Sequence, residues 1–220
     1  MSKKEWLLEI LEKTKNDTQF DDPPKYIIEI CNEIGLRGLT DNSIELSREQ
    51  RMDVARYTVA QGVQIETVVE GLTWKDFEGF IASILVENTY KCTESLRRIG
   101  NETAKGMEID VVGVKGRTIL SIDAKMWGMR TGKASALRKA AEKQLERSCE
   151  LASQLSLIHN RIQTLPRGQY TIFPVLTTWL VEDIMIHQGV PIVPIFQINS
   201  FILNFENYQH LIQSFQGELK

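Results

Sequence analysis

Two aspartates and a lysine interrupt the segment of the chain that is richest in β-branched residues. Asp110 interrupts the run I-D-V-V, and Asp123 and Lys125 interrupt the run L-S-I-D-A-K-M. Because Val and Ile favour strands, we expect these charged residues to lie on strands that are otherwise buried. Two carboxylates and an ammonium group in such surroundings need a partner or a ligand that offsets their desolvation.

The spacing of these residues predicts that they meet on one face of a β-hairpin. Gly116-Arg117 fits a two-residue loop of the Gly-X type. In that register Asp110 lies opposite Asp123, with the Cβ atoms roughly 5 Å apart. Lys125 follows on the same face, because strand side chains alternate. A shift of the loop by one residue would remove the direct facing of the two carboxylates.

Two facing carboxylates repel each other unless a cation compensates them. Mg²⁺ suits such a pair, because it prefers oxygen ligands and keeps several waters; Mn²⁺ is a candidate substitute. The backbone carbonyl of Ala124 is a candidate third ligand. Such a metal polarises a phosphoryl oxygen and lowers the pKa of a bound water, while Lys125 would orient the attacking water. The alternative is a structural Asp–Lys salt bridge, with Asp110 capping a strand.

A fourth candidate, Glu78, lies on the helix that we expect to precede these strands. Thr73 is the predicted N-cap, with Asp76 three residues later, and the helix should run to about Asn88. At helical spacing Glu78 falls at the edge of the apolar face. Its carboxylate would therefore reach the place where the helix meets the core, or it would extend into solvent.

The remaining pattern predicts an α/β fold. The expected order is a helix, three strands, a long helix and two or more further strands, forming a mixed central sheet flanked by helices. The N-terminal residues 1–72 read as a helical domain with a loose likeness to a helix-turn-helix unit, or as a structural cap of three or four helices, and residues 73–220 read as the second domain. Strands are predicted at residues 92–99, 108–115, 118–126, 170–179 and within 190–205, a long helix at 133–159, and a capping box at Ser47–Gln50.

Charge is unevenly distributed along the chain of 220 residues. The net charge is −3, but residues 111–150 carry nine Lys and Arg against four Asp and Glu. A local basic surface can bind phosphate whatever the total charge; the alternative is a solvated helix face. The three cysteines show no disulfide framework. The chain shows no membrane span and no signal peptide at its start, so we expect a cytoplasmic protein without a membrane partner.

Ile109-Asp110, a twelve-residue gap and Asp123-Ala124-Lys125 resemble the signature of the PD-(D/E)XK nuclease superfamily. Glu78 matches the acidic residue that many members carry on their first core helix. Within the superfamily the chain is most similar to Mrr-like restriction endonucleases and archaeal Holliday-junction-resolvase-like nucleases. There are two departures, since Ile109 stands in place of the proline and Asp123 in place of the commoner Glu.

The resemblance implies a restriction-endonuclease-like αβββαβ core and a Mg²⁺-dependent deoxyribonuclease. It implies metal ligands at Asp110, Asp123, Ala124 and Glu78, with Lys125 as a further catalytic residue. Arg130, Lys133, Arg138 and Gln144 are the implied contacts to DNA, which would be double-stranded or branched. Gln144 is also a candidate for the glutamine that some relatives place near the metal, or it is a solvated polar residue. A homodimer would suit the cutting of two strands.

Three other functions stay open at this stage. A catalytically silent DNA-binding or scaffold protein could keep the same fold. An RNA-directed nuclease would use the same phosphoryl chemistry. A small-molecule hydrolase is disfavoured by the basic helix.

Overall fold

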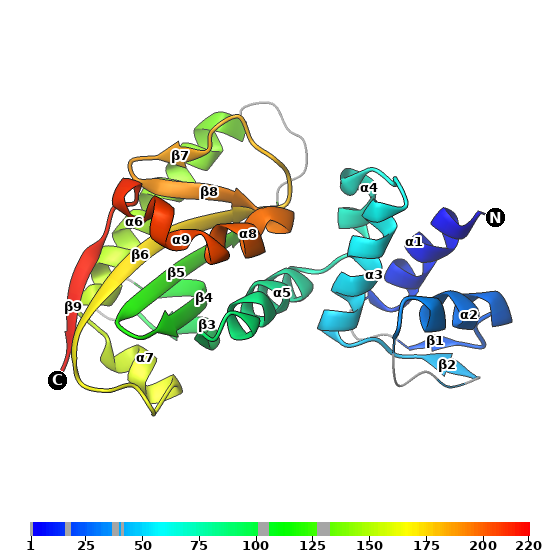
Figure 1. Cartoon of the computed structure of the whole chain (residues 1–220), viewed down its shortest axis with the longest axis horizontal. Coiled ribbons are helices and arrows are strands. Elements are labelled where there is room, and N and C mark those ends of the chain that lie inside the picture. The colour runs from blue at the N-terminus through cyan, green and yellow to red at the C-terminus, as the bar shows by residue number, and fades with distance from the viewer. Residues whose placement is uncertain (1, 16–18, 37–39, 41, 101–105, 127–132) are drawn as a thin grey trace. The chain divides into compact units, whose positions relative to one another are not determined.

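In the computed structural model, residues 2–15, 19–36, 40, 42–100, 106–126 and 133–220 are described. By its internal contacts the chain divides into two compact units, Met1–Phe80 and Ile81–Lys220. The division falls within one helix, α5 (Trp74–Glu87) (Figure 1). No helix in the described ranges is both long and apolar enough to cross a membrane.

The N-terminal unit is mainly helical, as predicted, with one short two-stranded sheet that was not predicted. Its elements are α1 (Lys3–Lys13), β1 (Phe20–Asp21), α2 (Lys25–Glu33), β2 (Ser43–Ile44), α3 (Arg48–Ala60), α4 (Ile65–Glu70) and the first half of α5. The strands β1 and β2 pair antiparallel. The predicted capping box at Ser47 is confirmed, because the Ser47 hydroxyl accepts the Gln50 N–H and the Gln50 side chain accepts the Ser47 N–H.

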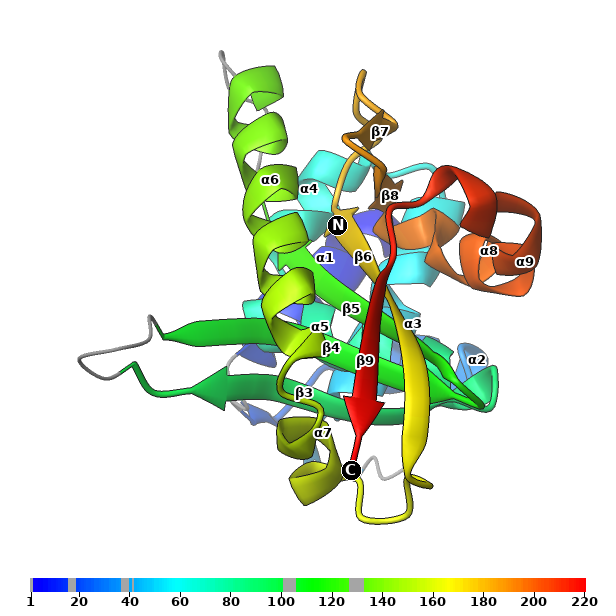
Figure 2. The same ribbon diagram turned by 90° about the vertical axis from the view of Figure 1, so that its left-hand side faces the viewer.

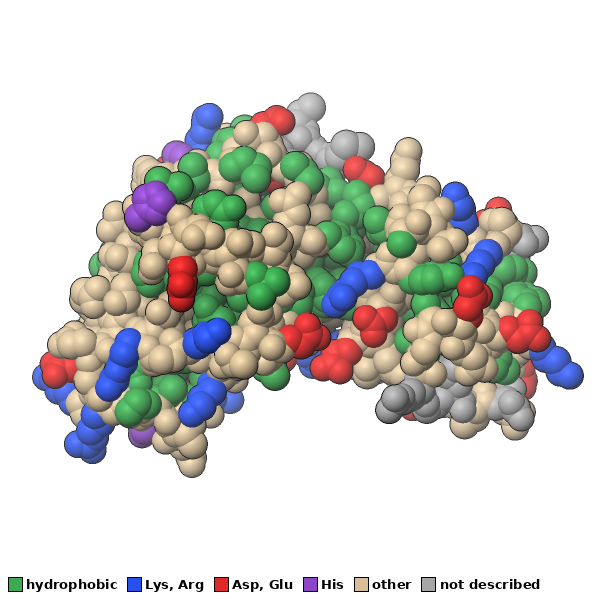
Figure 3. All heavy atoms as spheres, viewed as in Figure 1, with side chains coloured by type: hydrophobic (Ala, Val, Ile, Leu, Met, Phe, Trp, Pro, Cys, Tyr) green, Lys and Arg blue, Asp and Glu red, His purple; other side chains and the backbone are tan. Residues whose placement is uncertain are grey.

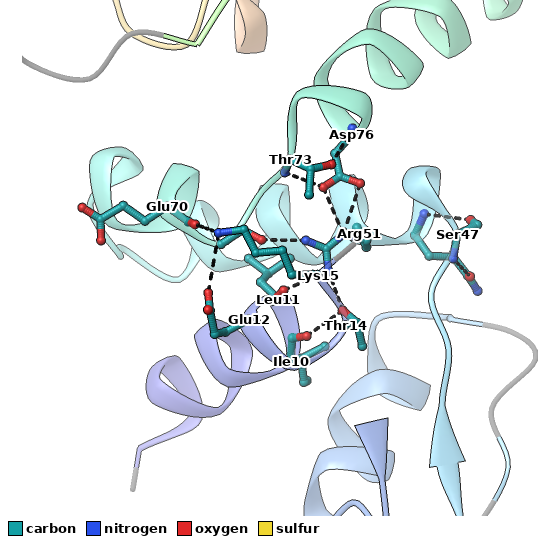
Figure 4. Close-up of polar contacts among 12 residues, drawn as sticks. Ile10, Leu11, Glu12, Thr14, Lys15, Ser47, Arg51, Glu70, Thr73 and Asp76 are labelled. Atoms are coloured by element: carbon teal, nitrogen blue, oxygen red, sulfur yellow. Dashed lines mark hydrogen bonds and ion pairs between the residues drawn. The ribbon is translucent and has the colours of Figure 1, made fainter. Parts of the chain in front are cut away.

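A buried arginine joins the helices of this unit. Arg51 on α3 is 2% exposed, and its Nε donates to both carboxylate oxygens of Asp76 at 3.1 Å. Its Nη1 donates to the Leu11 carbonyl and to the Thr14 hydroxyl, and its Nη2 donates to the Gly71 carbonyl (Figure 4). The guanidinium therefore ties α1, α3 and the start of α5 together, and the burial of its charge is offset by these acceptors.

The C-terminal unit is built on a mixed sheet of seven strands. Its order is β3-β4-β5-β6-β8-β7, with β9 also paired to β6. The strands are β3 (Lys91–Arg98), β4 (Met107–Lys115), β5 (Thr118–Lys125), β6 (Gly168–Thr178), β7 (Ile186–His187), β8 (Val190–Pro194) and β9 (Phe215–Leu219). The pairs β3–β4, β4–β5, β6–β9 and β7–β8 are antiparallel, while β5–β6 and β6–β8 are parallel.

Helices flank this sheet. They are α6 (Lys133–Ala152), α7 (Ser156–Arg161), α8 (Ile198–Leu203) and α9 (Phe205–Tyr208), with 3₁₀ turns η2 (Ile195–Gln197) and η3 (Gln209–Leu211). The helix α6 packs across β5, β6, β8 and β9 (Figure 2). Its buried Leu137 and Ala141 contact Leu176 of β6. On the opposite face, Leu85 of α5 lies against Gly113 of β4. The unit therefore has the mixed α/β architecture that the sequence predicts.

Two sequence predictions differ from the observed elements. Residues 195–205 are helical instead of extended, because Ile198 and Ile202 bury one face at helical spacing after Pro194 ends β8. The long helix ends at Ala152, where the Ser153 hydroxyl donates to the Glu150 carbonyl and competes with the helical pattern. The strand β9 was not predicted.

Candidate active site on the β4–β5 hairpin

The predicted hairpin and its register are confirmed. Lys115 pairs with Thr118 and Val111 pairs with Ile122, so Gly116-Arg117 forms the two-residue loop. Gly116 has φ +59°, the left-handed conformation that the first position of a Gly-X loop requires. This register fixes which side chains of the two strands share a face.

Asp110 lies just beyond the last described pair of the β4–β5 ladder. Continued by one residue, the same register puts it opposite Asp123. Its Oδ2 accepts a hydrogen bond of 2.7 Å from the Ala124 backbone N–H. Asp110 is 6% exposed and Asp123 is 1% exposed. The two carboxylates therefore stand on adjacent strands at the buried end of the hairpin, where each needs a compensating group.

The Lys125 ammonium contacts two of the expected metal-binding groups. Its Nζ lies 2.5 Å from Asp123 Oδ2 and donates to the Ala124 carbonyl at 3.2 Å. This ion pair follows from strand alternation, which puts Asp123 and Lys125 on one face. A positive charge thus sits between a carboxylate and a backbone carbonyl, beside the strand that carries Asp110.

The helix α6 brings a second cation to the same carboxylate. Arg147 Nη1 donates to Asp123 Oδ1 at 2.6 Å. From the sequence, Arg147 is expected only as one of the basic residues of 111–150 and not as part of the site. A signal was present, because Arg147 follows Gln144 by three residues and so lies one helical turn further along a face that approaches the sheet.

Gln144 is fully buried, so its alternative interpretation as a solvated residue is wrong. Its Nε2 donates to the Ser121 carbonyl at 2.6 Å and to the Ser121 hydroxyl at 3.0 Å. Ser121 precedes Asp123 on the same face of β5. The amide therefore ties α6 to the strand that carries Asp123. Among the described residues, the buried Gln144 Oε1 and Ser148 Oγ have no hydrogen-bond partner.

Glu78 belongs to the N-terminal unit. It is 6% exposed, and the Trp74 indole N–H donates to its carboxylate. The predicted cap of α5 is confirmed, since the Thr73 hydroxyl accepts the Asp76 N–H and the Asp76 carboxylate accepts the Thr73 N–H. The C-terminal unit brings together one group of side chains, here named the Asp123 cluster: Asp110, Asp123, Lys125, Gln144 and Arg147. The place of Glu78 in this cluster stays a prediction.

The expected contacts to nucleic acid are described only in part. Arg130 lies outside the described residues, and so does the side chain of Lys133, the first residue of α6. Arg138 is exposed on α6, and further along the same helix Lys143 is exposed and Arg147 is half-buried. Basic side chains therefore continue along the helix that also carries the second cation of the Asp123 cluster.

The donor set suits a hard cation. It consists of the Asp110 and Asp123 carboxylates and the Ala124 carbonyl, which are oxygen ligands of the kind that Mg²⁺ prefers. The Lys125 ammonium already bridges two of these groups, so they face a common position for a positive charge. In the parts of the chain that the structure covers, no three or more His, Cys, Asp or Glu side chains are grouped to hold a metal. Water would have to complete the coordination.

A separate apolar pocket lies in the C-terminal unit. Its volume is about 440 Å³, and Met185, Ile186, Pro191, Phe201 and Tyr208 are among the residues that line it. Hydrophobic side chains gather at the surface over β7 and β8 (Figure 3). Among the described residues, the lining contains no charged side chain and none of the residues of the Asp123 cluster. This pocket therefore does not suit a phosphorylated substrate.

Comparisons with known proteins leave the function open. No known protein family matches the chain. It is 29% identical over 137 residues to an uncharacterized protein of Archaeoglobus fulgidus, which covers 62% of this chain and 95% of that protein. A protein of unknown function with a crystal structure is 19% identical at a TM-score of 0.27, covering 46% of this chain and 45% of that one. A Vibrio cholerae protein is 12% identical at a TM-score of 0.36, covering 95% of this chain and 50% of that one.

The chain therefore spans about half the length of each of the two solved structures. Both TM-scores are too low for the likeness to assign a fold or an activity.

Proposed function

We propose that the chain is a metal-dependent endonuclease with a restriction-endonuclease-like core, which hydrolyses phosphodiester bonds in DNA. The observation that carries the proposal is the position of the Lys125 ammonium, between Asp123 Oδ2 and the Ala124 carbonyl and beside the strand that carries Asp110. Two buried carboxylates, a carbonyl and a lysine at one strand end supply the groups that metal-assisted phosphoryl hydrolysis needs.

Each side chain has a distinct role in this proposal. Asp110, Asp123 and the Ala124 carbonyl hold Mg²⁺ or Mn²⁺, which when bound polarises a phosphoryl oxygen and lowers the pKa of a bound water. Lys125 orients the attacking water and offsets negative charge that develops in the transition state. Glu78 serves as an outer ligand or as a ligand of a second metal.

The basic residues that precede and line α6 supply the substrate contacts. Arg130, Lys133 and Arg138 bind backbone phosphates, which gives affinity without sequence information. Gln144 holds β5 against α6 and so keeps the Asp123 side chain in place. A double-stranded or branched DNA would be cut on both strands by a homodimer, which provides two sites.

One observation favours a second candidate, a catalytically silent protein of the same fold that binds DNA. Both oxygens of Asp123 are already paired with cations, Lys125 and Arg147. This arrangement fits a structural salt bridge as well as a metal site. Such a protein would bind DNA equally well with and without a divalent metal.

The test is a cleavage assay on a panel of nucleic acids. Linear, supercoiled, single-stranded and branched DNA and matched RNA are incubated with the protein, with and without Mg²⁺ or Mn²⁺. The wild type is compared with Lys125→Ala and with Lys115→Ala, a control on the exposed end of the same hairpin. We expect cleavage of DNA that needs metal and that falls about 100-fold or more in Lys125→Ala with binding retained.

Each outcome decides between the candidates. The absence of cleavage of every form, with DNA binding intact, favours the silent protein. Preferential cleavage of RNA identifies an RNA-directed nuclease. Cleavage that survives in Lys125→Ala would show that the site lies elsewhere.

A further inference from the structure

Arg147 is held differently from the structural arginine of the same chain. Arg51 is 2% exposed and engages Nε, Nη1 and Nη2 with protein acceptors. Arg147 has a side chain that is 33% exposed, and within the described residues it makes one contact, from Nη1 to Asp123. Its remaining N–H groups have no acceptor among those residues. Most N–H donors of this planar guanidinium are therefore not used by the described residues.

The charges of the cluster are balanced without a metal. Asp123 contacts two cations, Lys125 at 2.5 Å and Arg147 at 2.6 Å. With Asp110 included, the four side chains sum to zero. A divalent cation bound by the two carboxylates brings the group to +2, and it competes with both ammonium and guanidinium for the Asp123 oxygens. The loaded site would then attract an anion.

We propose that Arg147 is a phosphate-binding residue, held on Asp123 in the metal-free protein and released when a divalent cation takes the carboxylate oxygens. This inference rests on the proposed function. The released guanidinium contacts the non-bridging oxygens of the phosphodiester group, because its parallel N–H donors match two phosphate oxygens. The neighbouring Gln144, bonded to Ser121 on β5, keeps this part of α6 at a fixed place above the strand.

The affinity for a divalent metal tests the role of Arg147 independently of catalysis. If Arg147 competes with the metal for Asp123, its removal strengthens metal binding. Titration calorimetry of Mg²⁺ and Mn²⁺ into metal-free protein, without nucleic acid, is expected to show about fivefold tighter binding in Arg147→Gln. That factor corresponds to the loss of a partly exposed ion pair worth about 1 kcal/mol. Arg147→Lys keeps the competing charge and should bind the metal as the wild type does.

The matched control is Arg97→Gln. Arg97 is also an ion-paired arginine of the C-terminal unit, but its partner is Glu108, and the pair is exposed. If metal binding responded only to the net charge of the protein, Arg97→Gln would tighten it as much as Arg147→Gln does. That outcome, or unchanged metal affinity in a folded Arg147→Gln, would overturn the inference.

A second measurement tests the contact to phosphate. At metal concentrations that saturate each variant, we expect cleavage by Arg147→Gln and by Arg147→Lys to fall about 100-fold, because a donor to the transition state is lost or misplaced. Retention of full cleavage by Arg147→Lys would contradict a contact that needs the guanidinium fork. Absence of metal binding in the wild type would instead remove the premise, and the proposed function would fail with it.

Discussion

At the scale of single residues, the cluster around Asp123 explains how charged side chains persist in a buried hairpin. Asp110 accepts the Ala124 N–H, while Asp123 pairs with Lys125 and Arg147. Each carboxylate thus has a partner, and the cost of desolvation is offset locally. A substitution that keeps these hydrogen bonds but removes a carboxylate charge distinguishes a structural role of the residue from a metal-binding role.

Asp110 offers such a separation. In Asp110→Asn the side-chain oxygen can still accept the Ala124 N–H, so the free energy of unfolding should fall by about 1 kcal/mol or less. In Asp110→Ala the buried N–H loses its acceptor, and we expect a loss of about 1–3 kcal/mol. Urea denaturation measures both values. Calorimetry should show loss of Mg²⁺ binding in both variants, and retained binding in Asp110→Asn would contradict the assignment.

Gln144 gives a prediction that depends on pH. Gln144→Glu places an acid beside the Ser121 carbonyl, where burial would raise its pKa in the folded state. A raised pKa gives stability that is present at low pH and lost as the pH rises above the ordinary value. We expect a loss of about 3 kcal/mol at pH 8 and a smaller loss at pH 4, measured by urea denaturation. Glu146→Gln, on the exposed face of α6, is the control, and equal losses at both pH values would contradict the prediction.

At the scale of elements, caps and buried ion pairs fix where the helices begin and how they meet. Asp76 has two roles, since it closes the capping box with Thr73 and receives the Arg51 guanidinium. Arg51 in turn binds the Leu11 carbonyl of α1 and the Gly71 carbonyl that follows α4 (Figure 4). The arrangement of the N-terminal helices therefore depends on one acid and one base.

Asp76→Asn should destabilise the N-terminal unit strongly. The substitution leaves a buried guanidinium without its counter-charge, which costs about 3–5 kcal/mol. Thr73→Ala removes only the cap and should cost about 1 kcal/mol. Glu33→Gln breaks the exposed pair with Lys3 in the same unit and should cost less than either. Alkylation of buried Cys31 in increasing urea reports the unfolding of this unit, and similar values for the three variants would contradict the ranking.

At the scale of the whole molecule, two compact units share one chain. One core cluster of the C-terminal unit joins the sheet to the helices α6 and α7, where Val112, Ile119, Leu151 and Ile158 are buried together. Each unit also contains a thiol that is shielded from solvent. Cys31 in the first unit is buried, and Cys92 in the second unit is half-buried. These thiols link the stability of the fold to pH.

Alkaline conditions should destabilise the protein. Burial raises the pKa of Cys31 from 9.0 to about 11, and burial raises the pKa of Cys92 from 9.0 to about 12. The unfolded chain loses these protons first, so the stability present below pH 9 falls as the pH rises from 9 toward 11. The midpoint of urea unfolding should decrease over this range, and it should decrease less steeply in Cys31→Ala. An unaltered slope in Cys31→Ala would contradict the assignment.

The sequence alone determined the features that depend on local geometry. A two-residue loop and strand alternation set the register of β4 and β5, so Asp123 and Lys125 could be placed on one face before any fold was known. The caps at Ser47 and Thr73 are equally local, since each involves residues three positions apart. These predictions were correct because no distant part of the chain decides them.

Only the tertiary structure decided which distant residues complete the cluster. Arg147 contacts Asp123 and Gln144 is buried against Ser121, because α6 packs over the part of β5 that carries these two residues. The helical state of residues 195–205 and the pairing of β9 with β6 also depend on packing against partners far along the chain. Spacing within a segment carries no information about such contacts, because burial and counter-charge there come from another element.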